Sequence, residues 1–168
     1  MLKISTLAKI ATTAGLSIFF GLSANALERI SDFSLIDSDG RFFQLSRQLD
    51  KQAVVLFAYD KSSRDARRAI ADLNDIADQF TNQTIGFAVI DTTATNDKAE
   101  MRKEAKDENI TMRILLDDTQ LVSEELGLSR VAEVVILDPS SREVLYRGAL
   151  NNRFSEGSRA RRASRHYL

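Results

Sequence analysis

Cysteine is absent from this 168-residue chain. Without cysteine the protein cannot form a disulfide, bind a metal through thiolates or be acylated as a lipoprotein. Histidine and proline occur once each, as His166 and Pro139. A single imidazole near the end of the chain leaves no set of soft metal ligands. We therefore expect a fold stabilised by its hydrophobic core alone, with no metal and no cofactor.

The overall composition is that of one ordinary globular domain. Hydrophobic residues make up 43% of the chain and charged residues 28%, which is enough material for a compact core. The 23 basic and 24 acidic side chains give a formal net charge of −1. Because there is no basic excess, we do not expect a nucleic-acid partner.

The first 26 residues have the three parts of a secretory signal peptide. Lys3 and Lys9 give a positive start, residues 10–22 are largely apolar, and Ala24-Asn25-Ala26 is a small-x-small cleavage pattern. An uncleaved membrane anchor is the alternative. The apolar stretch is interrupted by hydroxyl side chains, however, and is shorter than the roughly 20 residues of a spanning helix. We predict cleavage after Ala26, export to the periplasm or the medium, and no stable membrane anchor.

Hydrophobic periodicity divides residues 27–152 into alternating strands and helices. Residues 33–36 and 42–45 flank a turn-rich centre and predict a β-hairpin, and residues 53–58 form a continuous apolar run typical of a strand buried on both faces. The remaining predicted elements are helices over 62–80, 97–108 and 120–126 and strands over 85–90, 112–116, 134–137 and 144–146. This order predicts an α/β fold, a three-layer α/β/α sandwich with a mixed central sheet and an N-terminal β-hairpin.

Residues 153–168 form a basic C-terminal tail outside this pattern. Five arginines and His166 face a single acid, Glu156. A basic, apolar-poor tail is usually solvated, and docking to a partner or a larger exported assembly is the alternative.

The junction between the apolar strand and the first long helix resembles a known family. Residues 57–73 read FAYDKSSRDARRAIADL, which resembles the active-site strand, loop and helix of thioredoxin-like redoxins of the alkyl hydroperoxide reductase and thiol-specific antioxidant type. Residues 129–152 resemble the segment of that family that carries its cis-proline and final hairpin. The resemblance covers roughly residues 27–152, nearly the whole mature domain, and implies a thioredoxin-like fold.

At the functional positions of that family, the sequence departs from the pattern. The resemblance places Ser63 at the nucleophilic cysteine, Ala66 at the second cysteine, Ala132 at the cis-proline, and Asp60 at the threonine that orients peroxide. A serine hydroxyl is far less acidic than a thiol and cannot cycle through sulfenic acid or disulfide. Thiol peroxidase and disulfide oxidoreductase chemistry are therefore excluded, and a redoxin-lineage enzyme with altered activity is the alternative. Hydrolysis by Ser63 would need His166 to fold back as its base.

Ser62, Ser63 and Arg64 stand where the strand meets the helix. Ser62 followed by Asp65 is a near match to an N-terminal capping box, in which Ser62 would cap the helix. The free N–H groups of a helix start, both hydroxyls and the Arg64 guanidinium could also hold a carboxylate, sulfate or phosphate. In thioredoxins the cis-proline loop pairs with extended peptides, so the resemblance adds Ala132 to the candidate surface. We predict a non-catalytic binding or accessory module for a partner protein or a small anionic ligand.

Overall fold

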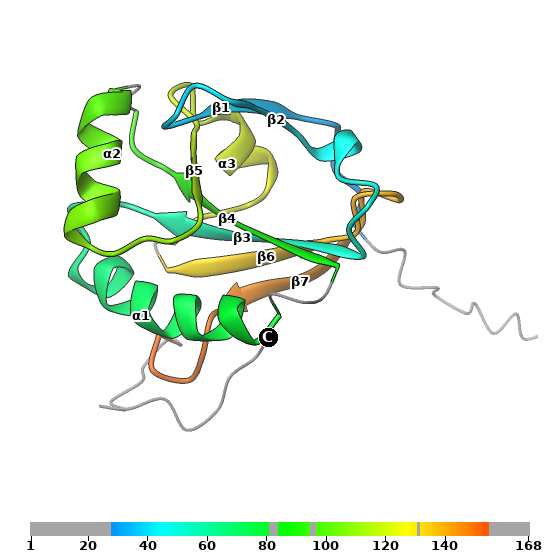
Figure 1. Cartoon of the computed structure of the whole chain (residues 1–168). Coiled ribbons are helices and arrows are strands. Elements are labelled where there is room, and N and C mark those ends of the chain that lie inside the picture. Colours follow the sequence, from blue (N-terminus) through cyan, green and yellow to red (C-terminus); the bar gives the residue numbers. More distant parts are fainter. Residues whose placement is uncertain (1–27, 81–83, 95–96, 131, 155–168) are drawn as a thin grey trace, which may run out of the picture.

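The computed structural model describes residues 28–80, 84–94, 97–130 and 132–154 (Figure 1). The predicted signal peptide, and the predicted tail beyond residue 154, lie outside these ranges and stay predictions. Within the described ranges, no helix combines the length and the apolar character that crossing a membrane requires.

Seven strands form one mixed sheet in the order β2-β1-β5-β4-β3-β6-β7. Strands β3, β4 and β5 are parallel, and the other neighbouring pairs are antiparallel. The strand bounds are β1 (Ser34–Asp37), β2 (Phe42–Gln44), β3 (Ala53–Tyr59), β4 (Ile85–Asp91), β5 (Arg113–Leu116), β6 (Glu133–Leu137) and β7 (Val144–Ala149). Strand β3 is buried from Val54 to Tyr59, which confirms the prediction made from its continuous apolar run.

Two separate apolar clusters lie on the two faces of the sheet. Residues of α1 (Arg64–Gln79) and α2 (Lys98–Asp107) pack with alternate β3 residues such as Phe57 in one cluster. The intervening β3 residues, such as Leu56, pack on the other face with the N-terminal hairpin and the region of α3 (Leu121–Glu125). A short 3-10 helix, η1 (Leu45–Arg47), follows β2. The predicted three-layer sandwich with a mixed sheet and an N-terminal hairpin is confirmed.

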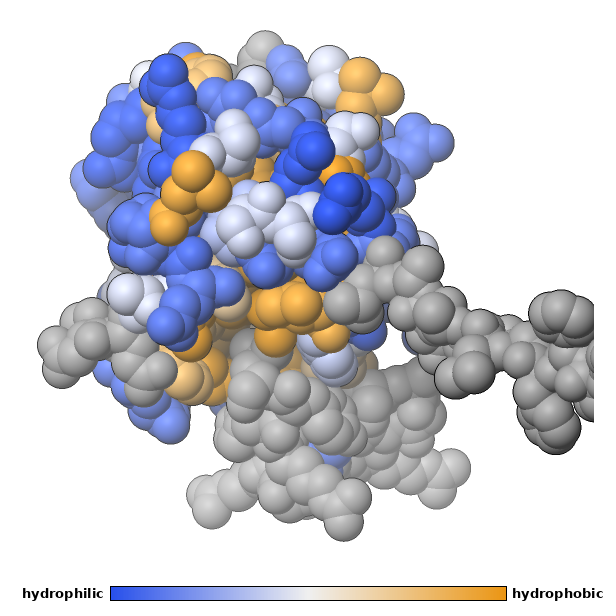
Figure 2. Space-filling model, turned by 90° about the vertical axis from the view of Figure 1, so that its right-hand side faces the viewer, coloured by the Kyte–Doolittle hydropathy of each residue, from blue (hydrophilic) through white to orange (hydrophobic). Residues whose placement is uncertain are grey.

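The surface is mainly hydrophilic, with separate hydrophobic patches, on the face shown in Figure 2. The large hydrophobic side chains that remain exposed are Ile36, Phe42, Leu49, Leu121 and Leu145. Scattered apolar side chains are normal on a soluble domain, whereas adjoining ones mark contact surfaces.

The carboxyl ends of the parallel strands meet at one edge of the sheet. The register aligns Tyr59 of β3 with Asp91 of β4, and Asp91 with Leu116 of β5. Helices α1 and α2 are the next elements along the chain after β3 and β4, each reached through a loop that leaves this end of the sheet (Figure 1). Since ligands of open α/β sheets bind outside the carboxyl ends of the strands, this edge is where the candidate site is expected.

Candidate functional site

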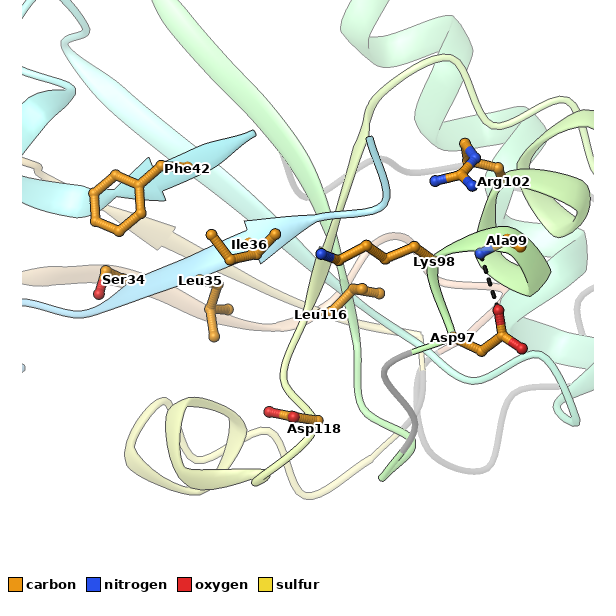
Figure 3. Close-up of a pocket in the computed structure, with 10 residues that line it drawn as sticks. All are labelled: Ser34, Leu35, Ile36, Phe42, Asp97, Lys98, Ala99, Arg102, Leu116 and Asp118. Atoms are coloured by element: carbon orange, nitrogen blue, oxygen red, sulfur yellow. Dashed lines mark hydrogen bonds between the residues drawn. The ribbon is translucent and has the colours of Figure 1, made fainter. Parts of the chain in front are cut away.

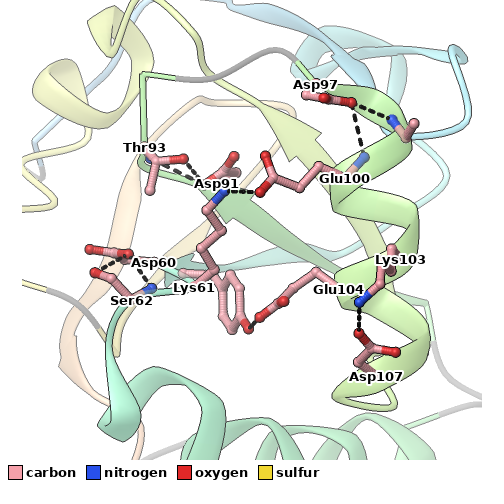
Figure 4. Close-up of polar contacts among 12 residues, drawn as sticks. Asp60, Lys61, Ser62, Asp91, Thr93, Asp97, Glu100, Lys103, Glu104 and Asp107 are labelled. Atoms are coloured by element: carbon pink, nitrogen blue, oxygen red, sulfur yellow. Dashed lines mark hydrogen bonds and ion pairs between the residues drawn. The ribbon is translucent and has the colours of Figure 1, made fainter.

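The loop between β3 and α1 is fixed by its own polar groups. Asp60 accepts hydrogen bonds at Oδ1 from the Ser62 backbone N–H at 2.7 Å and from the Ser62 hydroxyl at 2.6 Å (Figure 4). The Asp60 carbonyl oxygen accepts the Ser63 N–H at 2.9 Å. Arg67 donates from Nη1 to the Lys61 carbonyl oxygen. The helix start is therefore held in one conformation before any ligand arrives.

Ser63, and not Ser62, caps α1. The Ser63 backbone is extended, with φ −83° and ψ 117°, and its Oγ accepts the Ala66 N–H at 3.2 Å. The prediction of a capping box from Ser62 to Asp65 is wrong by one residue, because Asp60 engages the Ser62 hydroxyl. With Ser63 as the N-cap, the third helical residue is Ala66, which has no polar side chain to return the hydrogen bond.

Both positions that the family gives to thiols are occupied by residues with structural contacts. Ser63 provides the cap, and Ala66 is fully buried in the core beneath α1. Neither position presents a group that can exchange electrons. Both positions at which the family carries cysteine therefore belong to the packed and hydrogen-bonded start of α1.

Positive charge gathers at the N-terminal end of α1. Arg64 is the first helical residue and is exposed, while Arg67 lies 3.5 Å from Glu108 and Arg68 lies 3.9 Å from Asp65. A helix dipole disfavours cations at this end by a few tenths of a kcal/mol or more. The N–H groups of the first two helical residues also have no intrahelical acceptor. An anion at this place would satisfy these donors and offset the charge.

Ala132 lies beside β3 and is buried, with 3% of its surface exposed. Its φ is +66°, in the left-handed region, and its N–H donates to the Ala58 carbonyl oxygen at 3.0 Å. A proline has no N–H, so this hydrogen bond requires the replacement of the family's proline. Ala132 shares an apolar cluster with Ala66, but its side chain is not on an open surface. The structure therefore brings Ser62, Ser63 and Arg64 together at the helix start, whereas Ala132, predicted as part of the contact surface, is buried in the core.

A buried carboxyl group, which sequence reasoning missed, ends β4 at the same edge. Asp91 is fully buried, and its Oδ1 accepts the Thr93 N–H at 3.1 Å and the Thr93 hydroxyl at 2.8 Å (Figure 4). Its Oδ2 has no hydrogen-bond partner among the described residues. Burial raises the pKa of Asp91, and the Thr93 hydrogen bonds and the Lys61 charge only partly oppose it. The sequence contained one signal for this group, since Asp91 is the acidic last residue of an otherwise apolar strand.

Lys61 joins the loop to the neighbouring helix. Its Nζ lies 2.5 Å from Oε1 of Glu100 in the first turn of α2 (Figure 4). The hydrogen bond to Glu100 raises the pKa of Lys61. Although acids follow or end each parallel strand, no cluster of three or more potential metal-ligating side chains occurs in the described parts of the chain.

The fold, together with a strand–loop–helix junction at the redoxin position, defines a thioredoxin-like redoxin. The model of the AhpC/TSA family matches residues 27–147, and the chain belongs to this family. No curated protein matches the chain.

Similar solved structures carry the same fold at low sequence identity. Peroxidoxin BcpB from Mycobacterium tuberculosis is 22% identical over 73% of this chain and 84% of its own, with a TM-score of 0.62. A putative protein disulfide isomerase from Bacteroides thetaiotaomicron is 19% identical over 73% and 77%, with a TM-score of 0.63. An exposed lipoprotein thioredoxin from Streptococcus pneumoniae is 16% identical over 71% and 89%, with a TM-score of 0.61.

Proposed function

We propose that this chain is an exported, non-catalytic member of the AhpC/TSA family that binds a partner protein or a small anionic ligand at the start of α1. The observation that carries the proposal is the reassignment of both thiol positions. The Ser63 hydroxyl accepts the N–H of Ala66, and the Ala66 methyl group is packed in the core. With Ser63 and Ala66 in these structural roles, the start of α1 can still contact a ligand but cannot carry out redox chemistry.

The contact surface in this proposal consists of Ser62, Ser63 and Arg64, with Ala132 as its buried support. The first-turn N–H groups and the Arg64 guanidinium supply donors for a carboxylate, sulfate or phosphate. Asp60 and Lys61 fix the loop through the hydrogen bonds described above, which lowers the ordering cost of binding. An acidic side chain of a partner protein offers the same chemistry as a free anion.

Absence of turnover is the first test. The purified protein should neither turn over peroxide nor reduce insulin disulfides, because it has no cysteine thiol that can cycle between reduced and oxidised forms. Clear turnover in either assay would contradict the proposal and support the alternative, a redoxin-lineage enzyme with altered activity.

Anion binding is the second test. Titration with phosphate, followed by amide NMR, should shift the backbone signals of Arg64 and Asp65, and R64E should weaken binding by at least about tenfold. Arg29 is a suitable control position, because its side chain is 61% exposed and lies 3.9 Å from the Glu143 carboxylate. R29E should leave the titration unchanged. Equal weakening by both variants would indicate a nonspecific charge effect and contradict a site at Arg64.

Export is tested by the mass of the protein recovered outside the cytoplasm. Cleavage after Ala26 should give a mature chain that begins at Leu27. A recovered chain that keeps residues 1–26 would contradict the signal-peptide prediction.

A further inference from the structure

An open cavity of about 750 Å³ lies between the N-terminal hairpin and α2 (Figure 3). Its apolar floor is a row of three cross-strand partners, because Ile36 of β1 pairs with Phe42 of β2 on one side and with Leu116 of β5 on the other. Ile36 is 37% exposed and Phe42 is 51% exposed. These are adjoining apolar side chains on the face of the sheet that carries α2, so α2 leaves part of that face uncovered.

The wall of the cavity is the first part of α2, and two cationic side chains of this helix line it. Lys98 and Arg102 are four residues apart and therefore lie on the same side of the helix, toward the hairpin. Figure 3 shows the Lys98 side chain reaching over the floor toward Ile36. Within the described residues Lys98 takes part in no ion pair, since Glu100 is directed to the other side of α2 and contacts Lys61. Arg102 donates one N–H to the Ser38 carbonyl oxygen and keeps its remaining donors.

Two acids, Asp97 and Asp118, also line the cavity, and neither forms an ion pair with Lys98 among the described residues. Asp97 is the N-cap of α2 and accepts the N–H groups of Ala99 and Glu100 at 2.9 Å each. Asp118 lies beyond Leu116, at the opposite end of the group from Phe42 and Arg102 (Figure 3). The cavity thus combines an apolar floor with the cations Lys98 and Arg102 and the acids Asp97 and Asp118.

We propose that this cavity binds an amphipathic acid, with its apolar body on Ile36, Phe42 and Leu116 and its carboxylate on the Lys98 ammonium. The volume falls within the roughly 300–1,000 Å³ that small-molecule sites occupy. A neutral or cationic ligand of the same length would contact the apolar floor but would form no ion pair with the Lys98 ammonium. This site is separate from the start of α1, because the Lys61–Glu100 ion pair stands between them, and it does not rest on the function proposed above.

Calorimetric titration of the purified full chain tests the site with three probes of equal chain length: decanoate, decanol and decyltrimethylammonium. We expect decanoate to bind roughly two- to fivefold more tightly than the other two, since Lys98 is exposed and an exposed ion pair contributes about that much affinity. K98E should lower decanoate affinity by at least the same factor, and K98R should retain it. The control K103E alters a lysine of the same helix that is 77% exposed and paired with Asp107, and it should leave decanoate binding unchanged.

The floor is tested in the same way with a matched pair of exposed side chains. Phe42 is 51% exposed and Leu145, on β7, is 49% exposed. F42S should weaken decanoate binding, and L145S should not. Circular dichroism spectra and melting curves that match the wild type would show that each variant is folded.

The proposal is overturned if the three probes bind equally, if decanoate does not bind at millimolar concentration, or if K98E or F42S retains wild-type affinity. Equal binding of the acid, the alcohol and the ammonium probe would show that the cavity binds apolar chains without selecting a charge. Because R64E does not touch this cavity, it should leave decanoate binding intact, which separates a failure here from a failure of the site at α1.

Discussion

Replacing Ser63 by alanine tests whether the family's nucleophile position now serves as a helix cap. The Ser63 Oγ accepts the Ala66 N–H at 3.2 Å, and alanine removes that acceptor. Loss of a serine N-cap typically costs about 1 kcal/mol, within a range of roughly 0.5–2 kcal/mol. S63A should therefore lower the free energy of unfolding by about 1 kcal/mol.

Ser62 supplies the matched control, because it is exposed and adjacent but does not cap the helix. Its backbone N–H still reaches Asp60 Oδ1 at 2.7 Å after the hydroxyl is removed. S62A should then stay within about 0.5 kcal/mol of wild type, as most exposed substitutions do. S63D should recover the loss, because a carboxylate accepts the same N–H and favours the helix N-terminus by about 0.3–1 kcal/mol, with Asp60 opposing part of that gain.

Urea unfolding followed by far-UV circular dichroism measures all three variants. For a domain of this size, a loss of 1 kcal/mol also lowers Tm by about 3–5 °C. The assignment of Ser63 as the cap is refuted if S62A lowers the free energy of unfolding more than S63A does. It is also refuted if S63A is as stable as the wild type.

Three further predictions use the same unfolding assay. A132P should destabilise the domain by about 3 kcal/mol or more, because proline requires φ near −65° and cannot donate to Ala58, and a stability equal to wild type would contradict the observed backbone. Although burial alone would raise the pKa of Asp37, hydrogen bonds from the Arg41 backbone and from the Arg113 and Arg41 side chains hold it below its usual range. Asp37 therefore stabilises the fold above the ordinary aspartate pKa, and this contribution is lost as pH falls through its lowered pKa. D37N should cost about 2–4 kcal/mol at pH 7 and less in acid. The pH dependence that Asp91 contributes has the opposite sign, because burial raises the pKa of Asp91. The fold therefore loses stability as pH rises through this raised pKa. D91N should remove that loss, which a series of urea midpoints from acid to neutral pH would measure.

The periodicity of the sequence was sufficient for the elements and their order. The apolar stripe of α1 is buried at Ala66, Ala69, Ile70, Leu73 and Ile76, and the run that became β3 is buried as expected. These features depend on local spacing, which a sequence displays directly. The cap of α1 was misplaced by one residue because Ser62 and Ser63 offer the same hydroxyl. Only the position of the Asp60 carboxylate decides between them.

The cavity beside α2 could not be found from local patterns. Its floor comes from the hairpin and its cationic wall from Lys98 and Arg102, which lie far along the chain. One signal was present in Phe42-Phe43, since neighbouring residues of a strand face opposite sides and both faces would then carry an aromatic ring. The sequence alone does not say which of the two rings a helix covers, or that Phe42 stays exposed. The burial of Ala132 likewise depends on its contact with Ala58.

The hydrogen bond from Ala132 to Ala58 also constrains how the protein could change in evolution. It continues the antiparallel contact of β3 and β6 beyond the pair formed by Phe57 and Val134. A proline at Ala132 would remove this hydrogen bond, because proline has no N–H. A return to the family's residues at both Ser63 and Ala132 would therefore affect two different contacts, the cap of α1 and the hydrogen bond to Ala58.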